Sequence, residues 1–399
     1  MPATSVKTFY SFNGSAPVLH GNPGSLISVL DACLKDGFNP KTLDSLVVAG
    51  GVATAVVGAG HGYSLNQVMT LAGAAVGALN ADWRITFANA TTFKFACPGV
   101  ADGTIGGTIT AKLTPLGWAK PFSGTNLAAY KSNDPQSYGT YLRVDDTGST
   151  ARIARVWGCE SMTDINSYSG LFPTATQVSG GAYWGKSSTQ DAVSRPWIVM
   201  GDERCFYLWM APNPTSVIHG VLHFFGDILA QGGTDQWAVH IAGPTSDKTS
   251  AGGASYLQGC CSTNADTTCW FARSYTQLGS AVAPTRSPLG GSPSALSYSG
   301  AAALHPSLTA YPNPIDGALF VGAVALFEGG GLRGTYPGMY YVINGASAFL
   351  NATSHIDAVT GIDSLPGKTL QAVKVGTPGN ASTLYEGCVL MDNIGPWRT

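Results

Sequence analysis

Between residues 44 and 113, apolar and polar positions alternate in short runs, and Gly, Asn or Pro bounds each run. The runs are Val68–Ala74, Leu79–Phe87, Thr91–Ala96 and Gly106–Lys112. A period of two places successive side chains on opposite faces of a strand. Short strands separated by turn residues are typical of a small antiparallel sandwich. We therefore predict a self-contained β module over 44–113, inserted into a host domain made of 1–43 and 114–399.

Strand-like runs continue after the module. They are Gly139–Asp145, Ala151–Trp157, Pro196–Met200, Arg204–Met210, Val217–Phe225, Ala318–Phe327, Gly338–Ile343, Leu370–Val375 and Glu386–Met391. These runs either alternate or are apolar throughout, as strands in a sheet core do. The host is therefore predicted to be a mainly β, sandwich-like or sheet domain. Residues 242–315 hold few such runs, so we expect long ordered loops there, and a subdivision of the host near 235–315 stays open.

One helix is predicted near the N-terminus. Its apolar positions Leu26, Ile27, Leu30, Cys33 and Leu34 share one face of a helix. Ser25 is placed to cap its start, and Gly37 is placed to end it. Asp31 and Lys35 have the i, i+4 spacing of a helical ion pair. An amphipathic helix packed on a sheet explains this pattern fully.

The low charge content is the most informative feature of the composition. Charged residues make up 11% of the 399 residues, against roughly 25% in a typical soluble domain. The net charge is −2 with no basic run, which argues against nucleic-acid binding. So few charges cover a monomer's surface poorly, so we expect a homo-oligomer with largely uncharged interfaces.

The chain shows no targeting or membrane signal. Residues 1–10 lack the charged start and apolar stretch of a signal peptide. The longest apolar stretch, Leu46–Ala59, is interrupted by glycines and is shorter than the roughly 20 residues a membrane helix needs. We expect synthesis in the cytoplasm and no membrane span.

The eight cysteines show no metal or redox spacing. They are Cys33, Cys97, Cys159, Cys205, Cys260, Cys261, Cys269 and Cys388, and no pair has C-x-x-C spacing. Most lie in apolar runs and are interpreted as buried free thiols. Cys260, Cys261 and Cys269 lie in a polar loop, where a disulfide in an oxidising medium stays open.

Two sequence patterns contain the residue types of a binding site but lack the neighbouring residues that such a site needs. Gly329-x-Gly331-x-x-Gly334 matches a dinucleotide-binding turn, yet Thr335-Tyr-Pro-Gly338 follows and cannot open the required helix. His219 and His223 would share one face of a strand, but no third ligand is spaced to complete a metal site, and His240 and Asp235 do not change that.

The carboxylates and tryptophans are also better explained by structure than by chemistry. Carboxylates gather at Asp145-Asp146, Glu160 with Asp164, Asp202-Glu203 and Asp227. Two of them could flank a glycosidic bond, but residues in turns at strand ends look the same. Trp118, Trp157, Trp184, Trp197, Trp209, Trp237, Trp270 and Trp397 favour core packing over sugar stacking. The prediction is a protein that is not an enzyme, without catalytic, cofactor-binding or metal residues.

A series of short motifs carries a family resemblance. These are Gly117-Trp-Ala-Lys-Pro-Phe-Ser-Gly-Thr-Asn126, Tyr141-Leu-Arg-Val-Asp-Asp146, Glu160-Ser-Met-Thr-Asp164, Arg195-Pro-Trp197, Gly201-Asp202 and Phe225-Gly-Asp227. In this order they resemble virion structural proteins of tailed bacteriophages, in which the helix lies shortly before the Gly-Trp motif. Here the 44–113 module separates the two. The segment Gly73–Phe95 is similar to the immunoglobulin-like modules that are common insertions in such proteins.

The resemblance implies a structural role and no catalytic residues. We expect a subunit of a phage tail, tail tip or baseplate that assembles into a symmetric homo-oligomer and contacts other virion proteins. A capsid decoration or cement protein is the first alternative. The second, from a different class, is a glycan-binding or glycan-cleaving adhesion protein, with host surface glycan as a further partner. The position in the particle, the copy number and the symmetry stay open.

Overall fold

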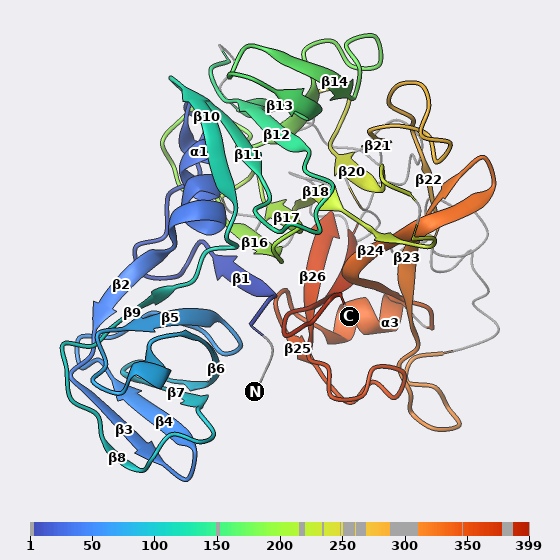
Figure 1. Ribbon diagram of the computed structural model, residues 1–399. Coiled ribbons are helices and arrows are strands. Elements are labelled where there is room, and N and C mark those ends of the chain that lie inside the picture. The colour runs from blue at the N-terminus through green and yellow to red at the C-terminus, as the bar shows by residue number, and fades with distance from the viewer. Residues whose placement is uncertain are drawn as a thin grey trace.

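The structure is a computed structural model that describes residues 4–148, 152–214, 220–233, 235–247, 249, 260, 269–287, 310–344, 346–376 and 386–398. Within these residues the chain is mainly β, as predicted, and its strands form four antiparallel sheets (Figure 1). Two short α-helices, α1 and α3, accompany them, and α3 was not predicted. Most predicted strands are present with shifted ends, because tertiary pairing rather than local pattern decides where a strand stops.

The first sheet, the module sheet, contains the inserted segment. Its strands are β2 (Phe38–Thr42), β3 (Ser45–Ala49), β4 (Val52–Val56), β5 (Val68–Ala72), β6 (Asp82–Ala88), β7 (Thr92–Ala96), β8 (Gly103–Thr104) and β9 (Thr110–Leu113), in the order β2-β9-β5-β6-β7-β4-β3-β8. The first half of β6 pairs with β5 and the second half with β7, with a register shift between Ile85 and Phe87. One strand thus joins the two halves of a small sandwich.

The module sheet begins at Phe38 rather than at residue 44. Phe38 pairs with Leu113 where the chain returns, so the segment leaves and re-enters the host at one point. Directly after it, Leu116 donates its N–H to the carbonyl of Cys33 at 2.9 Å, and Trp118 donates to Leu34 at 2.9 Å. The flanks of the insertion are therefore joined to each other within the host. Figure 1 shows the module as a separate lobe at the lower left.

The predicted helix begins at Ser25 but is capped differently from the prediction. Helix α1 spans Ser25–Leu30. The residue before it is Gly24, with φ 81°, which has no side chain to cap the helix. Ser25 instead donates its hydroxyl to the carbonyl of His20 at 2.7 Å. The capping acceptor comes from far along the chain, since Leu26 donates its N–H to Asp146 Oδ2 at 3.0 Å. Local spacing could not reveal a cap 120 residues away.

The second half of the helical segment is a π-helix, Asp31–Asp36, which Gly37 ends as predicted. The predicted Asp31–Lys35 pair is wrong, because the wider π turn moves i, i+4 residues apart. Asp31 pairs with Lys120 at 2.8 Å, and Lys35 pairs with Asp36 at 2.6 Å. The predicted apolar face is confirmed: Leu26, Ile27, Leu30, Cys33 and Leu34 are all buried.

The central sheet organises the host. It comprises β1 (Lys7–Tyr10), β16 (Trp197–Gly201), β17 (Cys205–Met210), β18 (Val221–Asp227), β20 (Val239–Ala242) and β21 (Cys269–Phe271), paired in that order. Along β17, Phe206 and Leu208 face one hydrophobic core, while Tyr207 and Trp209 face another. A strand covered on both faces has no polar side, which explains why this run is apolar throughout.

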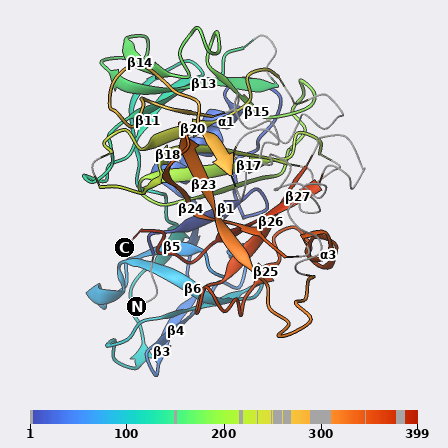
Figure 2. The same ribbon diagram turned by 90° about the vertical axis from the view of Figure 1, so that its right-hand side faces the viewer.

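The two other sheets cover the two faces of the central sheet (Figures 1 and 2). The hairpin sheet contains β10 (Ala119–Gly124), β11 (Leu127–Lys131), β12 (Tyr141–Asp145), β13 (Ile153–Met162) and β14 (Tyr168–Phe172), with β15 (Ala182–Gly185) on β13. Its core residues share a cluster with the module sheet and α1.

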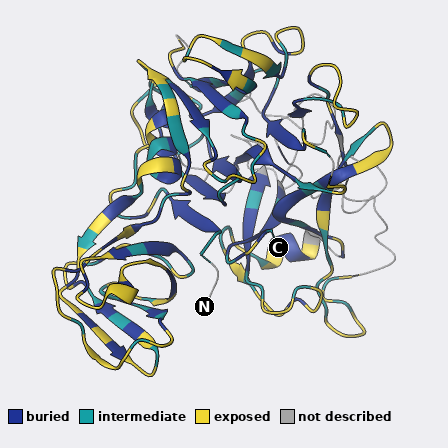
Figure 3. Cartoon of the chain, in the orientation of Figure 1, coloured by how far each residue is buried: buried dark blue, intermediate teal, exposed yellow. Residues whose placement is uncertain are grey.

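The C-terminal sheet packs on the opposite face of the central sheet. Its strands are β22 (Thr285–Ser287), β23 (Val321–Glu328), β24 (Gly331–Val342), β27 (Glu386–Asp392), β26 (Leu370–Gly376) and β25 (Ala358–Val359), with β19 (Leu229–Ala230) on β24 and helix α3 (Ala346–Ala352) beside it. Figure 3 shows burial concentrated in the central strands, while the tip of the β23–β24 hairpin is exposed. Much of the predicted 242–315 loop region lies outside the described residues, which hold β21 and β22 there.

Candidate functional site

The predicted carboxylates are dispersed, and each is engaged in a structural contact. Asp146 is buried against Lys186, whose ammonium also donates to the carbonyl of Asn22 at 2.7 Å. Burial raises the pKa of Asp146 and lowers that of Lys186, while each partner counteracts the shift of the other. Together with the bond from Leu26, this pair fastens the start of α1 to the end of β12. It is a structural pair inside the protein.

A second group of predicted carboxylates surrounds the C-terminal Arg398. Its Nε donates to Asp202 Oδ2 at 2.8 Å, and a terminal nitrogen donates to the carbonyl of Asp227 at 2.5 Å. Desolvation raises the pKa of the Asp227 carboxyl to about 7, and Arg398 opposes that rise. Asp227 also accepts from the N–H of Tyr138 at 3.2 Å. These contacts hold the last residues against the end of the central sheet.

The remaining predicted carboxylates are in turns or ion pairs. Asp145 accepts from Thr147, Asp164 accepts from the N–H of Asn166, Glu203 lies 3.6 Å from Lys7, and Glu160 pairs with Arg273. The structure therefore does not gather them at one place.

Of the two spaced histidines, only His223 lies within the described residues. His219 lies outside the described residues, whereas His223 is buried in β18 and stacks on Trp184 with ring centroids 5.2 Å apart. Burial lowers the pKa of His223 to about 3. His240, also buried, bonds the Tyr336 hydroxyl at 2.8 Å. In the described part of the chain, no three His, Cys, Asp or Glu side chains are grouped to hold a metal.

The glycine motif is the tip of a β-hairpin. Gly329 and Gly330, with φ 57° and 85°, connect β23 to β24 between the paired residues Glu328 and Gly331. Two positive φ angles define the tight turn that matches the twist of a hairpin. Because β24 follows at once, no helix N-terminus faces this loop. The interpretation as a glycine loop rather than a dinucleotide site agrees with this geometry.

The predicted tryptophans mostly lie in the cores. Seven of the eight are buried: Trp118, Trp157, Trp184, Trp197, Trp209, Trp270 and Trp397. Several donate their indole N–H to a carbonyl of another segment, as Trp209 does to Lys374 at 2.8 Å. Trp237 is half-buried, and the guanidinium of Arg273 lies 4.5 Å from its ring.

Six of the eight cysteines are buried, and in the described residues none is in a disulfide. The described cysteines are Cys33, Cys97, Cys159, Cys205, Cys260, Cys269 and Cys388, of which only Cys388 is partly exposed. Cys261 lies outside the described residues, and Cys260 and Cys269 are not joined to each other in this structure.

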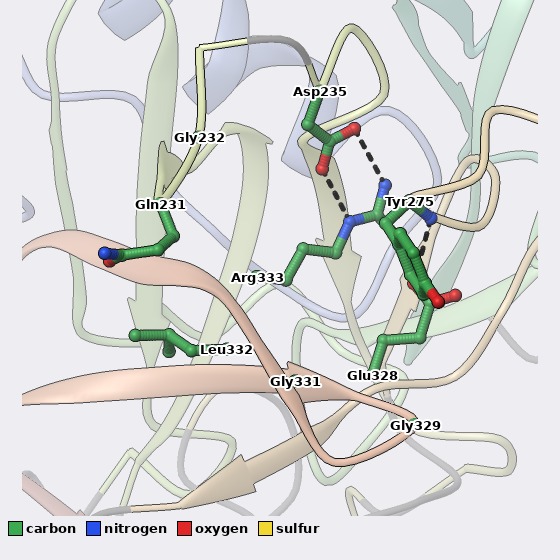
Figure 4. Close-up of a pocket in the computed structure, with 9 residues that line it drawn as sticks. All are labelled: Gln231, Gly232, Asp235, Tyr275, Glu328, Gly329, Gly331, Leu332 and Arg333. Carbon is green, nitrogen blue, oxygen red and sulfur yellow. Dashed lines mark hydrogen bonds and ion pairs between the residues drawn. The ribbon is translucent and has the colours of Figure 1, made fainter.

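An open groove beside the tip of the β23–β24 hairpin is the best candidate for a binding site. It has a volume of about 530 Å³. Its lining comes from distant segments: Gln231, Gly232, Asp235, Tyr275, Glu328, Gly329, Gly331, Leu332 and Arg333. Figure 4 shows Asp235, Glu328 and Tyr275 around Arg333, with Gln231 and Leu332 on the other side. We call this the hairpin groove.

The buried guanidinium of Arg333 organises the hairpin groove. Its Nε donates to Asp235 Oδ2 at 2.8 Å, and its two terminal nitrogens bond Asp235 Oδ1 at 3.2 Å and Glu328 Oε2 at 2.7 Å. The same nitrogens donate to the carbonyls of Arg273 at 2.7 Å and Trp237 at 2.9 Å. All five N–H donors of the fork are thus used. The guanidinium carbon of Arg333 lies 3.9 Å from the centre of the Phe271 ring, so the ring packs against the guanidinium.

Glu328 and Arg273 connect the groove to its surroundings. Glu328 accepts from the Ser274 hydroxyl at 2.5 Å and from the N–H of Tyr275 at 3.3 Å, which holds the tyrosine at the rim. Arg273 forms two 2.6 Å bonds to Glu160, and this bond raises the pKa of Arg273. A second hollow of about 360 Å³ lies on the Glu160 side of the same segment.

The sequence pattern did not identify this groove. Neither periodicity nor any motif points to Asp235, Tyr275, Glu328 and Arg333 as a group. The lining residues come from three stretches with no common spacing, so a single sequence carries almost no signal for them. The glycines at 329–334 were the one visible trace, because they shape the hairpin tip.

The arrangement provides fixed hydrogen-bond acceptors around an exposed aromatic ring. Both groove carboxylates already accept from Arg333, so their remaining lone pairs have defined directions. Such preorganised polar groups favour binding, because little order remains to be imposed by a ligand.

In the described residues, no helix is long and apolar enough to cross a membrane. Compared with protein-family models and with curated proteins, the chain matches none.

Proposed function

We propose that this protein is a structural subunit of a tailed-phage virion, located in the tail, tail tip or baseplate and assembled as a symmetric homo-oligomer. The observation that carries the proposal is the position of the motifs behind the family resemblance. Their polar residues form hydrogen bonds and ion pairs that link different segments of the chain. In the part of the chain that the structure describes, these residues do not line one common pocket. A subunit whose most distinctive residues maintain its shape suits a structural role.

The Gly117-Trp and Gly201-Asp202 motifs are fastened to each other. Trp118 packs edge-on against Phe206 at 5.5 Å and donates its indole N–H to the carbonyl of Asp202 at 3.3 Å. The carboxylate of Asp202 accepts the N–H groups of Arg204 and Cys205, both at 2.8 Å. These bonds join the hairpin sheet to the central sheet at the turn between β16 and β17.

The Arg195-Pro-Trp197 motif fastens the N-terminal segment. Arg195 is buried and donates to the carbonyl of Pro212 at 2.8 Å and to Asp191 at 3.0 Å. Trp197 donates its indole N–H to the carbonyl of Pro17 at 3.0 Å. The motif thus bonds residues near the N-terminus to the central sheet. This supports a structural role for the motif rather than a catalytic one.

The distribution of charge supports the homo-oligomer. The sequence has 21 Lys and Arg and 23 Asp and Glu. Eleven of these side chains are buried within the described residues: Lys7, Arg84, Arg143, Asp146, Lys186, Arg195, Asp202, Asp227, Arg286, Arg333 and Asp392. Of the 44 charged side chains, these 11 do not contribute to the surface, which leaves at most 33 for a chain of 399 residues. Contacts with other subunits are the usual way to cover such a surface.

The oligomer can be tested with purified recombinant protein. Multi-angle light scattering between low and moderate salt should give one defined multimer. Because salt screens charge pairs far more than apolar contacts, the multimer should persist as salt rises. A soluble monomer at all protein and salt concentrations would refute this part of the proposal.

A further inference from the structure

We propose that the hairpin groove binds a neutral oligosaccharide. Nothing in the virion proposal requires such a site, and the inference stands on the groove alone. Its volume of about 530 Å³ lies within the roughly 300–1,000 Å³ typical of ligand sites. The groove is also open along its rim, because Gln231, Gly232, Tyr275, Gly329 and Leu332 are all exposed. An open hollow of this volume admits sugar units.

The rim offers a stacking surface. Tyr275 is 60% exposed although its backbone N–H is bonded to Glu328. A planar ring that is open to water, on a backbone held by this bond, suits the apolar face of a sugar ring, which is flat and weakly hydrated. Leu332, 40% exposed, extends this apolar strip across the groove. Glycines 232, 329 and 331 add no side chains, so a ligand can approach the backbone closely.

The polar groups match the hydroxyl groups of a sugar. Asp235 and Glu328 are acceptors that cannot swing away, because Arg333 holds both. The exposed amide of Gln231 adds donors and an acceptor on the opposite side. Adjacent sugar hydroxyls both donate and accept hydrogen bonds, so planar carboxylate and amide groups suit them.

The charge of the groove selects for neutral ligands. Two carboxylates face one guanidinium, so the cluster is net negative. Arg333 is only 5% exposed, and all five of its N–H donors already have protein partners. No cationic donor of this cluster is left for a phosphate, sulfate or carboxylate. Anionic sugars and nucleotides are therefore disfavoured, whereas uncharged sugars meet no repulsion.

A peptide is the less suitable occupant. Peptide grooves rely on apolar pockets for anchor side chains or on an unpaired strand edge. Among the described residues that line this groove, the apolar side chains are the ring of Tyr275 and Leu332, both at the rim. Beside the groove, Gly334 and Thr335 of strand β24 pair with both β19 and β23. Strand β24 therefore has no unpaired edge at these two residues.

The test is binding of full-length protein to a glycan array containing neutral hexose, deoxyhexose and N-acetylhexosamine oligosaccharides, with sialylated and sulfated counterparts. Hits are then titrated by calorimetry. We expect neutral glycans to bind and their anionic counterparts to bind at least tenfold more weakly. Tyr275→Ala should weaken binding about tenfold by removing the stacking surface. Tyr275→Phe should restore it, because the ring remains.

Phe12→Ala is the matched control, since Phe12 is also 60% exposed but does not line the groove. This variant should bind like the unchanged protein. The proposal is overturned if no neutral glycan binds at millimolar concentration, if anionic glycans bind best, or if Tyr275→Ala and Phe12→Ala bind equally. It is also overturned if a library of unstructured peptides displaces the glycan without dependence on Tyr275. None of these outcomes bears on incorporation into virions, which is tested separately on particles.

Discussion

At the scale of single residues, polar groups inside this protein mostly join segments that are distant in sequence. The Asp146–Lys186 pair is the clearest case, because neither side chain is exposed and each has a backbone partner. A buried pair gains little over two apolar residues, but a lone buried charge is costly. The pair as a whole therefore adds little to the free energy of unfolding, whereas loss of either partner alone would lower it strongly.

The first prediction concerns this pair. Lys186→Met should lower the free energy of unfolding by about 3–5 kcal/mol, because it leaves the Asp146 carboxylate without its counter-ion. The double variant Asp146→Asn with Lys186→Met should lose much less than the two single losses combined. Urea denaturation of the four proteins measures this. Additive losses would contradict the account of a coupled pair.

The second prediction is a pH dependence that originates at His223. Burial depresses its folded pKa to about 3, so this imidazole takes up a proton when the protein unfolds below its ordinary pKa of 6.5. Its contribution to stability is therefore complete above that pH and is lost as pH falls toward 3. His223→Leu should reduce proton uptake on unfolding by roughly one near pH 4.5.

The measurement is the slope of unfolding free energy against pH between pH 4 and 6. Phe225→Leu, in the same strand, is the control, because its ring packs on Phe172, Phe206 and Trp118: it should change stability without changing the slope. His240 and His355 also have lowered pKa values through burial, so the variant should retain part of the acid sensitivity. An unchanged slope in His223→Leu would show that this imidazole is not held neutral.

At the scale of secondary structure, the sequence predicted what local pattern determines. Strand β17 and the buried face of α1 follow from periodicity, and Gly37 ends the helix as expected. The π-helical turn and the cap from Asp146 did not follow, because both depend on packing against the hairpin sheet. The hairpin groove was invisible for the same reason: its residues meet only after two sheets have formed.

The third prediction concerns the hairpin that borders the groove. Gly329 has φ 57°, and a Cβ added there would meet no atom within 4 Å. Backbone strain rather than crowding should therefore decide which residues fit. Gly329→Asn should cost only a few tenths of a kcal/mol, because Asn tolerates this conformation. Gly329→Val should cost about 1–2 kcal/mol more, because a β-branched residue does not. Equal losses in thermal or urea denaturation would contradict this reasoning.

At the scale of the whole molecule, the module is joined to the host by polar contacts as well as by its covalent flanks. Arg84 donates to the carbonyls of Val6 at 2.9 Å and Asn393 at 3.0 Å, and Gln67 donates to Thr8 at 2.8 Å. Both chain ends of the host thus touch the module. Independent folding of the host without the module stays a prediction.

The fourth prediction is that the host folds when residues 38–113 are replaced by a short Gly-Ser linker. The flanks are already joined through Cys33, Leu34, Leu116 and Trp118, so the linker spans a short gap. Deleting only 44–113 is the matched comparison, because it leaves β2 without its partner β9. Cooperative melting of the first variant, and a less stable or aggregating second variant, are expected. Loss of cooperative melting in both would show that the host requires the module.

Quantitative mass spectrometry of purified virions is the sharpest test of the proposal that this protein is a built-in component of a phage particle. The ratio of this chain to the major capsid protein should correspond to a few up to about a dozen copies per particle, as a closed symmetric ring in a tail or baseplate requires. Absence of the chain from particles that retain their tails would contradict the account.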